Sequence, residues 1–170
     1  SEIGKPKFAS GEIPIITARD SDAVVNEPIQ VDESTYTISA VNVGNPVACM
    51  FVPDFELDWR LIGPKIENHE RFPSRVNVVF VRIFDRENIE IRIWERGAGE
   101  TAASGTCSVG AAVLSALQLK TERKVSVHSP GGITKVEWRA SDDEVVITGS
   151  AEFVYSGQWP AGATLSARKS

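Results

Sequence analysis

The sequence predicts an α+β fold, in which a mostly antiparallel β-sheet, curled or closed into a barrel, wraps around one central buried helix. Two observations predict it. Alternating, β-branched segments account for most of the chain and are typical of strands. The nineteen residues Thr101–Leu119 carry no charge, and every face of a helix at about 105–119 would be apolar or small. A helix without a polar side is buried all round, so we expect 1–170 to form a single domain built around it.

Strands are expected where β-branched residues alternate with polar ones, at 35–43, 47–52, 75–84, 89–94, 125–129, 133–138 and 144–149. The clearest case is IEIRIW, in which three isoleucines face one side of the strand and Glu90 and Arg92 face the other. The turns DREN (85–88) and ASDDE (140–144) each join two of these segments, which favours antiparallel hairpins.

Helical signals are scarce outside 105–119. FELDWRLIGPKIENH (55–69) predicts a short surface helix near 56–69, interrupted at Gly63–Pro64. Inside the buried helix, small residues such as Gly105, Gly110 and Ala111 would let strands approach closely.

The composition excludes several classes of protein. The 42% apolar and 24% charged residues are those of a soluble globular protein, and the net charge of −5 provides no basic footprint for nucleic acid. Two cysteines, Cys49 and Cys107, predict free thiols in a reducing cytoplasm. Polar residues scattered through 101–119 argue against a membrane span, and no signal peptide is recognisable. Because the chain starts at Ser1 rather than methionine, we expect an engineered remnant or a fragment of something longer.

Ser104, Gly105 and Thr106 stand where the buried helix would begin. The first turn of a helix presents unpaired N–H groups and about half a positive charge. These three residues are therefore expected to form a binding site, or cradle, for a carboxylate or phosphate. A plain N-cap role for Ser104 explains the same residue equally well at this point. Neither a Walker loop nor a nucleophile elbow fits, since no Gly-Lys-Ser/Thr follows and Ala102 and Thr106 stand where an elbow needs glycines.

The segment ERGAGETAASGT (95–106) resembles the second active-site motif of diaminopimelate epimerases, E-R-G-x-G-E-T-x-A-C-G-T-G. Further segments are similar to that family in the same order: VNVGNPVACMFV to its G-N-P-H segment, RFPSRVNVVFV to its F-P-x-x-x-N-V stretch, VHSPGGITKVEW to its late strand pair and GSAEFVYSGQW to its closing strand. The resemblance covers the C-terminal half of the family. The N-terminal motif, with the first catalytic cysteine, has no counterpart, so we expect that half to be absent.

The resemblance implies a fold of two similar halves, each a barrel around a helix, that hold an amino-acid substrate between them. It implies an epimerase or racemase of lysine biosynthesis in which two cysteines exchange the α-proton without pyridoxal phosphate or a metal. Gly105 and Thr106 would donate backbone N–H groups to the α-carboxylate. Glu95 and Arg96 would bind the amino group and a distal carboxylate, and substrate hydrogen bonds would come from Asn45 and Asn77.

Two positions depart from the family pattern. Ser104 stands where the family has its second catalytic cysteine, and a serine hydroxyl needs an adjacent base in order to react. Val47 replaces the histidine of the G-N-P-H motif. Cys107, one helical turn deeper, is a conceivable substitute base, although a buried core thiol is the favoured interpretation.

The histidines predict structural roles. His69 lies in a polar stretch and His128 lies at a strand end before a turn, and nothing places either one beside Ser104 for a catalytic triad. Without a Cys/His cluster no metal site is expected. Glu95 and Arg96 also fit a plain ion pair at a strand end.

Three functions remain open. The first is half of a cofactor-independent epimerase, inactive alone because position 104 is serine and the first half is missing. The second is a one-base isomerase or dehydratase of the same superfamily. The third is a non-catalytic half that binds a small carboxylate or a partner protein. An isolated half would leave an apolar rim open, which favours self-association.

Overall fold

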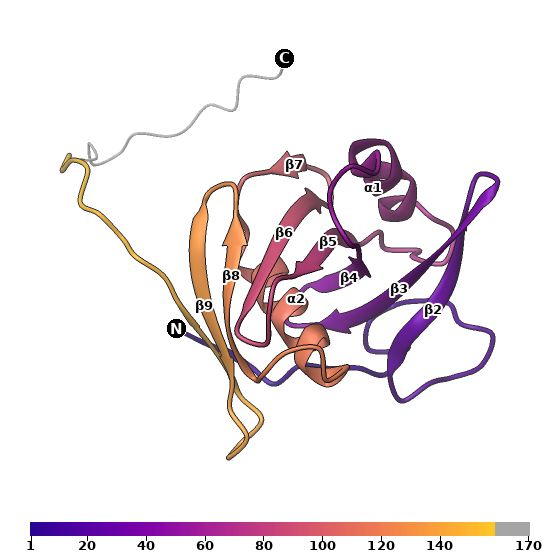
Figure 1. Ribbon diagram of the computed structural model, residues 1–170, viewed down its shortest axis with the longest axis horizontal. Coiled ribbons are helices and arrows are strands. Elements are labelled where there is room, and N and C mark those ends of the chain that lie inside the picture. Colours follow the sequence, from indigo (N-terminus) through magenta and orange to yellow (C-terminus); the bar gives the residue numbers. More distant parts are fainter. Residues whose placement is uncertain (159–170) are drawn as a thin grey trace.

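A computed structural model describes residues 1–158 and contains ten strands and two helices. The elements, in chain order, are β1 (Glu2–Gly4), β2 (Val24–Val31), β3 (Ser34–Asn42), β4 (Pro46–Phe51), α1 (Trp59–Glu67), β5 (Asn77–Ile83), β6 (Asn88–Glu95), β7 (Gly99–Thr101), α2 (Gly105–Leu117), β8 (Lys124–Ser129), β9 (Gly132–Trp138) and β10 (Val145–Thr148). Figure 1 shows their arrangement.

The strands form one mixed sheet in the order β1-β10-β9-β8-β6-β5-β4-β3-β2, with the short β7 paired to β6. The hairpins predicted at 85–88 and 140–144 are present as the antiparallel pairs β5–β6 and β9–β10. Two pairs are parallel, β4–β5 and β6–β8. The sheet-dominated α+β fold is thus confirmed. The expected barrel is not, because within residues 1–158 no pairing joins β1 to β2 and the sheet stays open.

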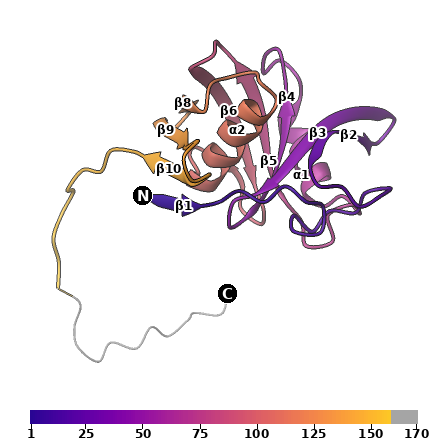
Figure 2. The ribbon, with the colours of Figure 1, turned by 90° about the horizontal axis from the view of Figure 1, so that it is seen from below.

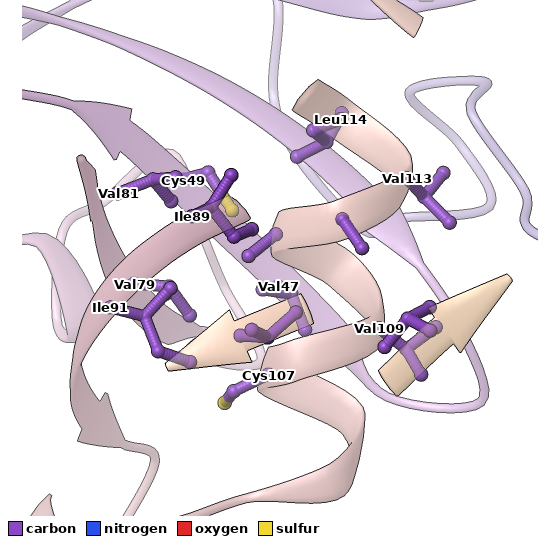
Figure 3. Packing of buried hydrophobic residues seen from close by; sticks show 14 of the residues in the cluster. Val47, Cys49, Val79, Val81, Ile89, Ile91, Cys107, Val109, Val113 and Leu114 are labelled. Atoms are coloured by element: carbon purple, nitrogen blue, oxygen red, sulfur yellow. The ribbon is translucent and has the colours of Figure 1, made fainter. Parts of the chain in front are cut away.

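Helix α2 lies within the curve of this sheet (Figures 1 and 2). Residues 107–116 of the helix are buried, as the absence of a polar side requires. Alternate residues of β4, β5 and β6 point at the helix, so that Val47, Cys49 and Val79 pack against it (Figure 3). The closest approach is at Gly110, where an added Cβ would lie 2.8 Å from Cγ1 of Val47. Val47, which replaces the histidine of the family motif, therefore belongs to the core.

Helix α1 covers the opposite face of the strands. The residues of β4 and β5 that point away from α2, Ala48, Val78 and Phe80 among them, form a second core cluster with Trp59 and Ile66 of α1. The predicted interruption at Gly63–Pro64 is wrong, since α1 runs through Pro64 to Glu67. The packing explains this, because an added Cβ at Gly63 would lie 2.9 Å from Trp94, so only glycine lets the helix lie this close to β6.

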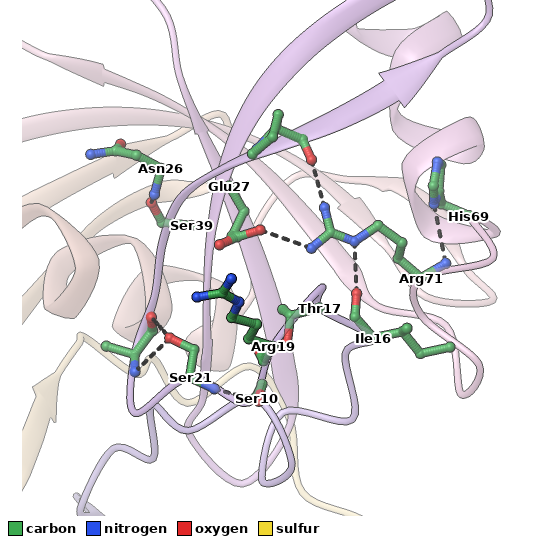
Figure 4. A network of polar contacts seen from close by, with 12 residues as sticks. Ser10, Ile16, Thr17, Arg19, Ser21, Asn26, Glu27, Ser39, His69 and Arg71 are labelled. Atoms are coloured by element: carbon green, nitrogen blue, oxygen red, sulfur yellow. Dashed lines mark hydrogen bonds and ion pairs between the residues drawn. The ribbon is translucent and has the colours of Figure 1, made fainter.

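The sequence did not predict β2. Side-chain contacts from outside the sheet hold this strand in place (Figure 4). The Arg71 guanidinium donates to the carbonyl oxygens of Ile16 (2.7 Å) and Pro28 (2.5 Å) and pairs with Glu27 (3.0 Å). Pro28 weakened the strand signal, but β2 is an end strand, where a proline removes no essential hydrogen bond of the sheet.

The expected closing strand at 149–159 does not form within the described residues, and Trp159 lies outside them. Residues 149–158 have no regular structure, and Phe153, Val154 and Tyr155 are more than 80% exposed. The outer side of β10 already pairs with β1, so β10 itself offers these residues no free edge. In the part of the chain that is described, neither helix has the length and apolar character needed to span a membrane.

The Gly110–Val47 contact predicts a compensating pair of substitutions. Gly110→Ala should reduce the free energy of unfolding by about 2 kcal/mol, because its Cβ would lie 2.8 Å from Cγ1 and 2.9 Å from Cβ of Val47. Adding Val47→Ala should recover part of that loss. Urea denaturation measures both variants. Gly105→Ala is the control, because its Cβ would meet only Cδ1 of Ile147, at 3.5 Å. If the double variant loses as much free energy of unfolding as the two single substitutions together, the close contact is contradicted.

Candidate functional site

Three strand ends meet at one edge of the sheet and bring distant parts of the sequence together. Parallel strands β4 and β5 both begin there, with Val47 opposite Asn77, and antiparallel β6 ends there, with Trp94 opposite Val78. Asn45 therefore lies just before β4, Asn77 opens β5, and Glu95 and Arg96 follow at the end of β6. The first turn of α2 comes next along the chain, after β7 has folded back on β6.

The start of α2 is open. Gly105 is exposed, and Ser104 and Thr106 are half-buried. The first helical hydrogen bond runs from the Ser108 amide to the Ser104 carbonyl oxygen (3.0 Å), so the preceding amides have no partner inside the helix. No other group among residues 1–158 accepts a hydrogen bond from the Gly105 or Thr106 amide. Ser104 occupies the N-cap position with extended φ and ψ (−154° and 126°), yet its side chain caps no amide. The N-cap interpretation therefore holds for the position of Ser104, but not for a capping hydrogen bond from its side chain.

Arg96 is held in place by three contacts. Its guanidinium donates to Oδ1 of Asn45 and to the carbonyl oxygen of Ser74, both at 3.0 Å, while its backbone amide donates to Oδ1 of Asn77 (3.0 Å). Asn77 is 2% exposed, and its amide group also donates to the Pro46 carbonyl oxygen (2.9 Å). Asn77 thus joins the starts of β4 and β5 to the loop after β6. The substrate contacts expected of Asn45, Asn77 and Arg96 stay predictions.

Glu95 is half-buried, and its carboxylate accepts a hydrogen bond from the Thr101 hydroxyl at 2.7 Å. In the part of the chain that the structure describes, Glu95 forms no salt bridge with Arg96, so the simple ion pair proposed for these neighbours is wrong. A carboxylate fixed by one hydroxyl can still accept hydrogen bonds from an ammonium group.

The two cysteines are both fully buried, Cys49 on β4 and Cys107 on α2. Burial raises the pKa of Cys107 to about 12; a hydrogen bond with Ser104 offsets part of this rise, and the negative charge of Glu95 adds the smallest contribution, which is upward. Burial also raises the pKa of Cys49 well above its ordinary value. Both thiols are therefore protonated at neutral pH. Cys107 cannot act as a thiolate base, and it fits the favoured interpretation of a core thiol.

Both histidines make structural contacts. His69 accepts a hydrogen bond from the Arg71 amide at Nδ1 (3.2 Å), and its Nε2 lies 2.8 Å from the Gln30 carbonyl oxygen. His128, near the end of β8, bonds through Nε2 to Oδ1 of Asn88 (3.1 Å). Among the described residues, no three His, Cys, Asp or Glu side chains lie close enough together to hold a metal ion.

The sequence alone did not identify Glu67 as a candidate site residue. Its carboxylate accepts hydrogen bonds from the Gly97 amide (2.8 Å) and from Nε1 of Trp94 (2.9 Å), the residues on either side of Glu95 and Arg96. One signal could have found it. Trp59, Ile62, Gly63 and Ile66 form the buried side of α1, and Glu67 continues that side as its single charged member.

The family model for diaminopimelate epimerase matches residues 39–154, the part of the chain that carries this site and the buried core residues around α2. The chain belongs to the diaminopimelate epimerase family. It is 40% identical over 157 residues to the diaminopimelate epimerase of Desulfitobacterium hafniense, and 38% identical over 158 residues to that of Nostoc punctiforme. Each match covers 92% of this chain but only 54% and 57% of the relative, so the chain spans about half the length of these epimerases.

The epimerase-family fold extends to a more distant solved structure. A probable proline racemase from Agrobacterium radiobacter K84 superposes with a TM-score of 0.54 over 85% of this chain and 47% of that protein. At 14% sequence identity this likeness concerns the fold alone.

The raised pKa values predict slow alkylation of the native epimerase-family chain. At pH 8 a thiol with a pKa of about 12 holds a thiolate fraction near 10⁻⁴, so iodoacetamide should modify Cys107 at least about a hundredfold more slowly than in urea. Mass spectrometry of the peptides measures this rate. Ser104→Cys is the matched control, since a half-buried thiol at the start of α2 should react readily. Comparable rates at positions 104 and 107 would contradict the assignment.

Proposed function

We propose that the chain forms the carboxylate-binding wall of a cofactor-independent amino-acid epimerase site, with diaminopimelate as its ligand. One observation carries the proposal: the amides of Gly105 and Thr106 stand unpaired at the exposed start of an otherwise buried helix. Buried helices present about half a positive charge at this end, and a carboxylate satisfies both the charge and the donors. Membership of the diaminopimelate epimerase family supports the choice of ligand.

The polar groups beside α2 suit the other groups of such a ligand. Glu95 offers a carboxylate for the ammonium group, and it approaches from the strand end next to the helix. The guanidinium of Arg96, held by Asn45 and Ser74, offers a fixed cation for a distal carboxylate. Because these groups are already fixed by protein hydrogen bonds, little ordering is needed when the ligand binds.

Epimerisation requires one base to remove the α-proton and an acid on the opposite face to return one. This wall supplies neither in its present form. Among residues 1–158 no His, Asp or Glu side chain is hydrogen-bonded to the Ser104 hydroxyl, and Cys107 keeps its proton near neutral pH. A fixed positive field at the carboxylate would still stabilise the carbanion formed when another group removes the proton. We therefore propose that this chain binds the amino acid without turning it over, and that proton transfer depends on a second wall.

The same observation favours a second candidate, a one-base isomerase or dehydratase of the same superfamily. With Ser104 and a protonated Cys107 on this side, a proton could leave from the opposite face only, and Ser104 would serve to hold the substrate. This candidate differs from the first in the product it forms.

A proline at the first position of α2 tests the carboxylate cradle. Gly105→Pro deletes one donor without breaking the helix, because Ser104 already has the extended backbone that precedes proline and the first helical residue tolerates it. We expect the Kd for meso-diaminopimelate to rise about tenfold, the usual effect of losing a hydrogen bond to a charged group. Chemical shifts of backbone amides in a titration measure it.

Thr106→Ala is the matched control for the proline variant, since it removes a hydroxyl from the same turn and keeps the backbone N–H. If the unmodified chain shows no shift at Gly105 or Thr106 at millimolar ligand, the cradle has no ligand of this class. If Gly105→Pro binds as tightly as the unmodified chain, the ligand contacts other groups.

Proton exchange separates the two candidate functions. In D₂O we expect this chain to leave the α-proton signal of meso-diaminopimelate at its uncatalysed intensity, because neither Ser104 nor Cys107 is a base near neutral pH. Proton NMR over a day measures the signal, with Ser104→Cys as the comparison. Deuterium incorporation without inversion, or loss of water from a hydroxylated amino acid, would instead establish the one-base reaction.

A further inference from the structure

We propose that Glu67 is a positioning residue for the ligand-binding pair Glu95 and Arg96. The inference rests on the proposed function, since it assigns Glu67 the task of holding the loop that presents these two side chains. Glu67 is the last residue of α1, on the face of the sheet opposite α2, and it is only 5% exposed.

The Glu67 carboxylate uses both oxygens. Oε1 accepts from the backbone amide of Gly97 at 2.8 Å and from Nη1 of Arg75 at 3.2 Å, while Oε2 accepts from Nε1 of Trp94 at 2.9 Å. Trp94 and Gly97 directly flank the pair Glu95 and Arg96. One buried carboxylate therefore fixes the chain immediately before and immediately after the two residues expected to meet the ligand.

The cost of burying Glu67 indicates a specific role. A buried carboxylate is expensive unless donors surround it, and three donors converge on this one. Two of the three partners adopt backbone conformations with positive φ, Arg75 at 58° and Gly97 at 77°. The left-handed region is unfavourable for a non-glycine residue such as Arg75, so the surrounding contacts must hold it there.

Trp94 of β6 also packs against Gly63 of α1, but the other two partners of Glu67 lie outside the packing between α1 and the sheet, Gly97 in the loop after β6 and Arg75 in the turn before β5. That turn also contributes the Ser74 carbonyl oxygen that accepts from Arg96. Apolar contacts of Trp59, Ile62 and Ile66 already attach α1 to the second core cluster. Loss of the Glu67 hydrogen bonds should therefore displace residues 94–97 and leave the helix in place.

Glu67→Gln tests this role with an isosteric side chain. A glutamine has one acceptor oxygen and one amide nitrogen, so it must point a donor at either Trp94 or Gly97, both of which are donors. We expect the Kd for meso-diaminopimelate to rise at least about fivefold, as for a buried donor left without a partner. Acetate has neither an ammonium group nor a distal carboxylate, so we expect it to use the α2 cradle alone and its Kd to change less than about twofold.

A second substitution provides the rescue. Trp94→Phe removes the donor that opposes the glutamine amide, so Glu67→Gln combined with Trp94→Phe should bind diaminopimelate more tightly than Glu67→Gln alone. Ser39→Ala is the matched control for stability. Ser39 is 1% exposed and accepts from the Asn26 amide and from Gln118, both at 3.0 Å, but it does not touch the loop. It should leave both dissociation constants unchanged.

Hydrogen exchange of the Gly97 amide provides a readout that needs no ligand. Because this amide donates to a buried carboxylate, it should be protected in the unmodified chain, and Glu67→Gln should speed its exchange by about tenfold. Rapid exchange in the unmodified chain overturns the inference, as does equal binding of diaminopimelate by Glu67→Gln. If the unmodified chain binds neither ligand, the proposed function fails, whatever Gly97 does.

Discussion

Helix α2 has no side that can face water, and its enclosure determines the rest of the structure. The sheet must curl to cover it, and Gly110 permits the closest contact, with Val47. The ends of α2 reach the surface, and at the first turn Gly105 is exposed. A buried helix whose N-terminus opens to solvent concentrates its unpaired donors and its positive potential at that end. The requirement for burial thus produces the feature on which binding would depend.

The strands that enclose α2 also carry the polar groups beside its open end. Strands β4 and β5 run parallel and β6 runs antiparallel to β5, so the two starts and the one end lie at the same edge. Alternation along these strands divides their side chains between the cluster beneath α2 and the cluster beneath α1. Glu67 connects the second cluster to the loop at that edge. The positions of Asn45, Asn77 and Arg96 therefore follow from packing on both faces of the sheet.

Features that depend on local pattern could be predicted from the sequence, and those that depend on tertiary contacts could not. The alternation in IEIRIW predicted β6, and the uncharged run at 101–119 predicted a helix, observed at Gly105–Leu117. Gly63 in α1 packs closely against Trp94 and β2 is held by Arg71, and no local pattern reveals either contact. The closure of the barrel was mispredicted for the same reason, because whether an edge strand pairs depends on which distant strand lies beside it. In the sequence Glu67 resembles an ordinary surface charge, because its three donors come from other segments of the chain.

The two parallel pairs have a kinetic consequence. Hairpins such as β5–β6 and β8–β9 join neighbours in the sequence and can form early. The parallel pair β6–β8 forms later, because β7 and α2 separate these two strands in the sequence. We expect α2 to dock late in folding, and pulse-labelled refolding would show its amides gaining protection after those of the hairpins. The open turn at Gly105 would then exist only in molecules whose sheet is complete, so a partly folded chain would not compete for the ligand.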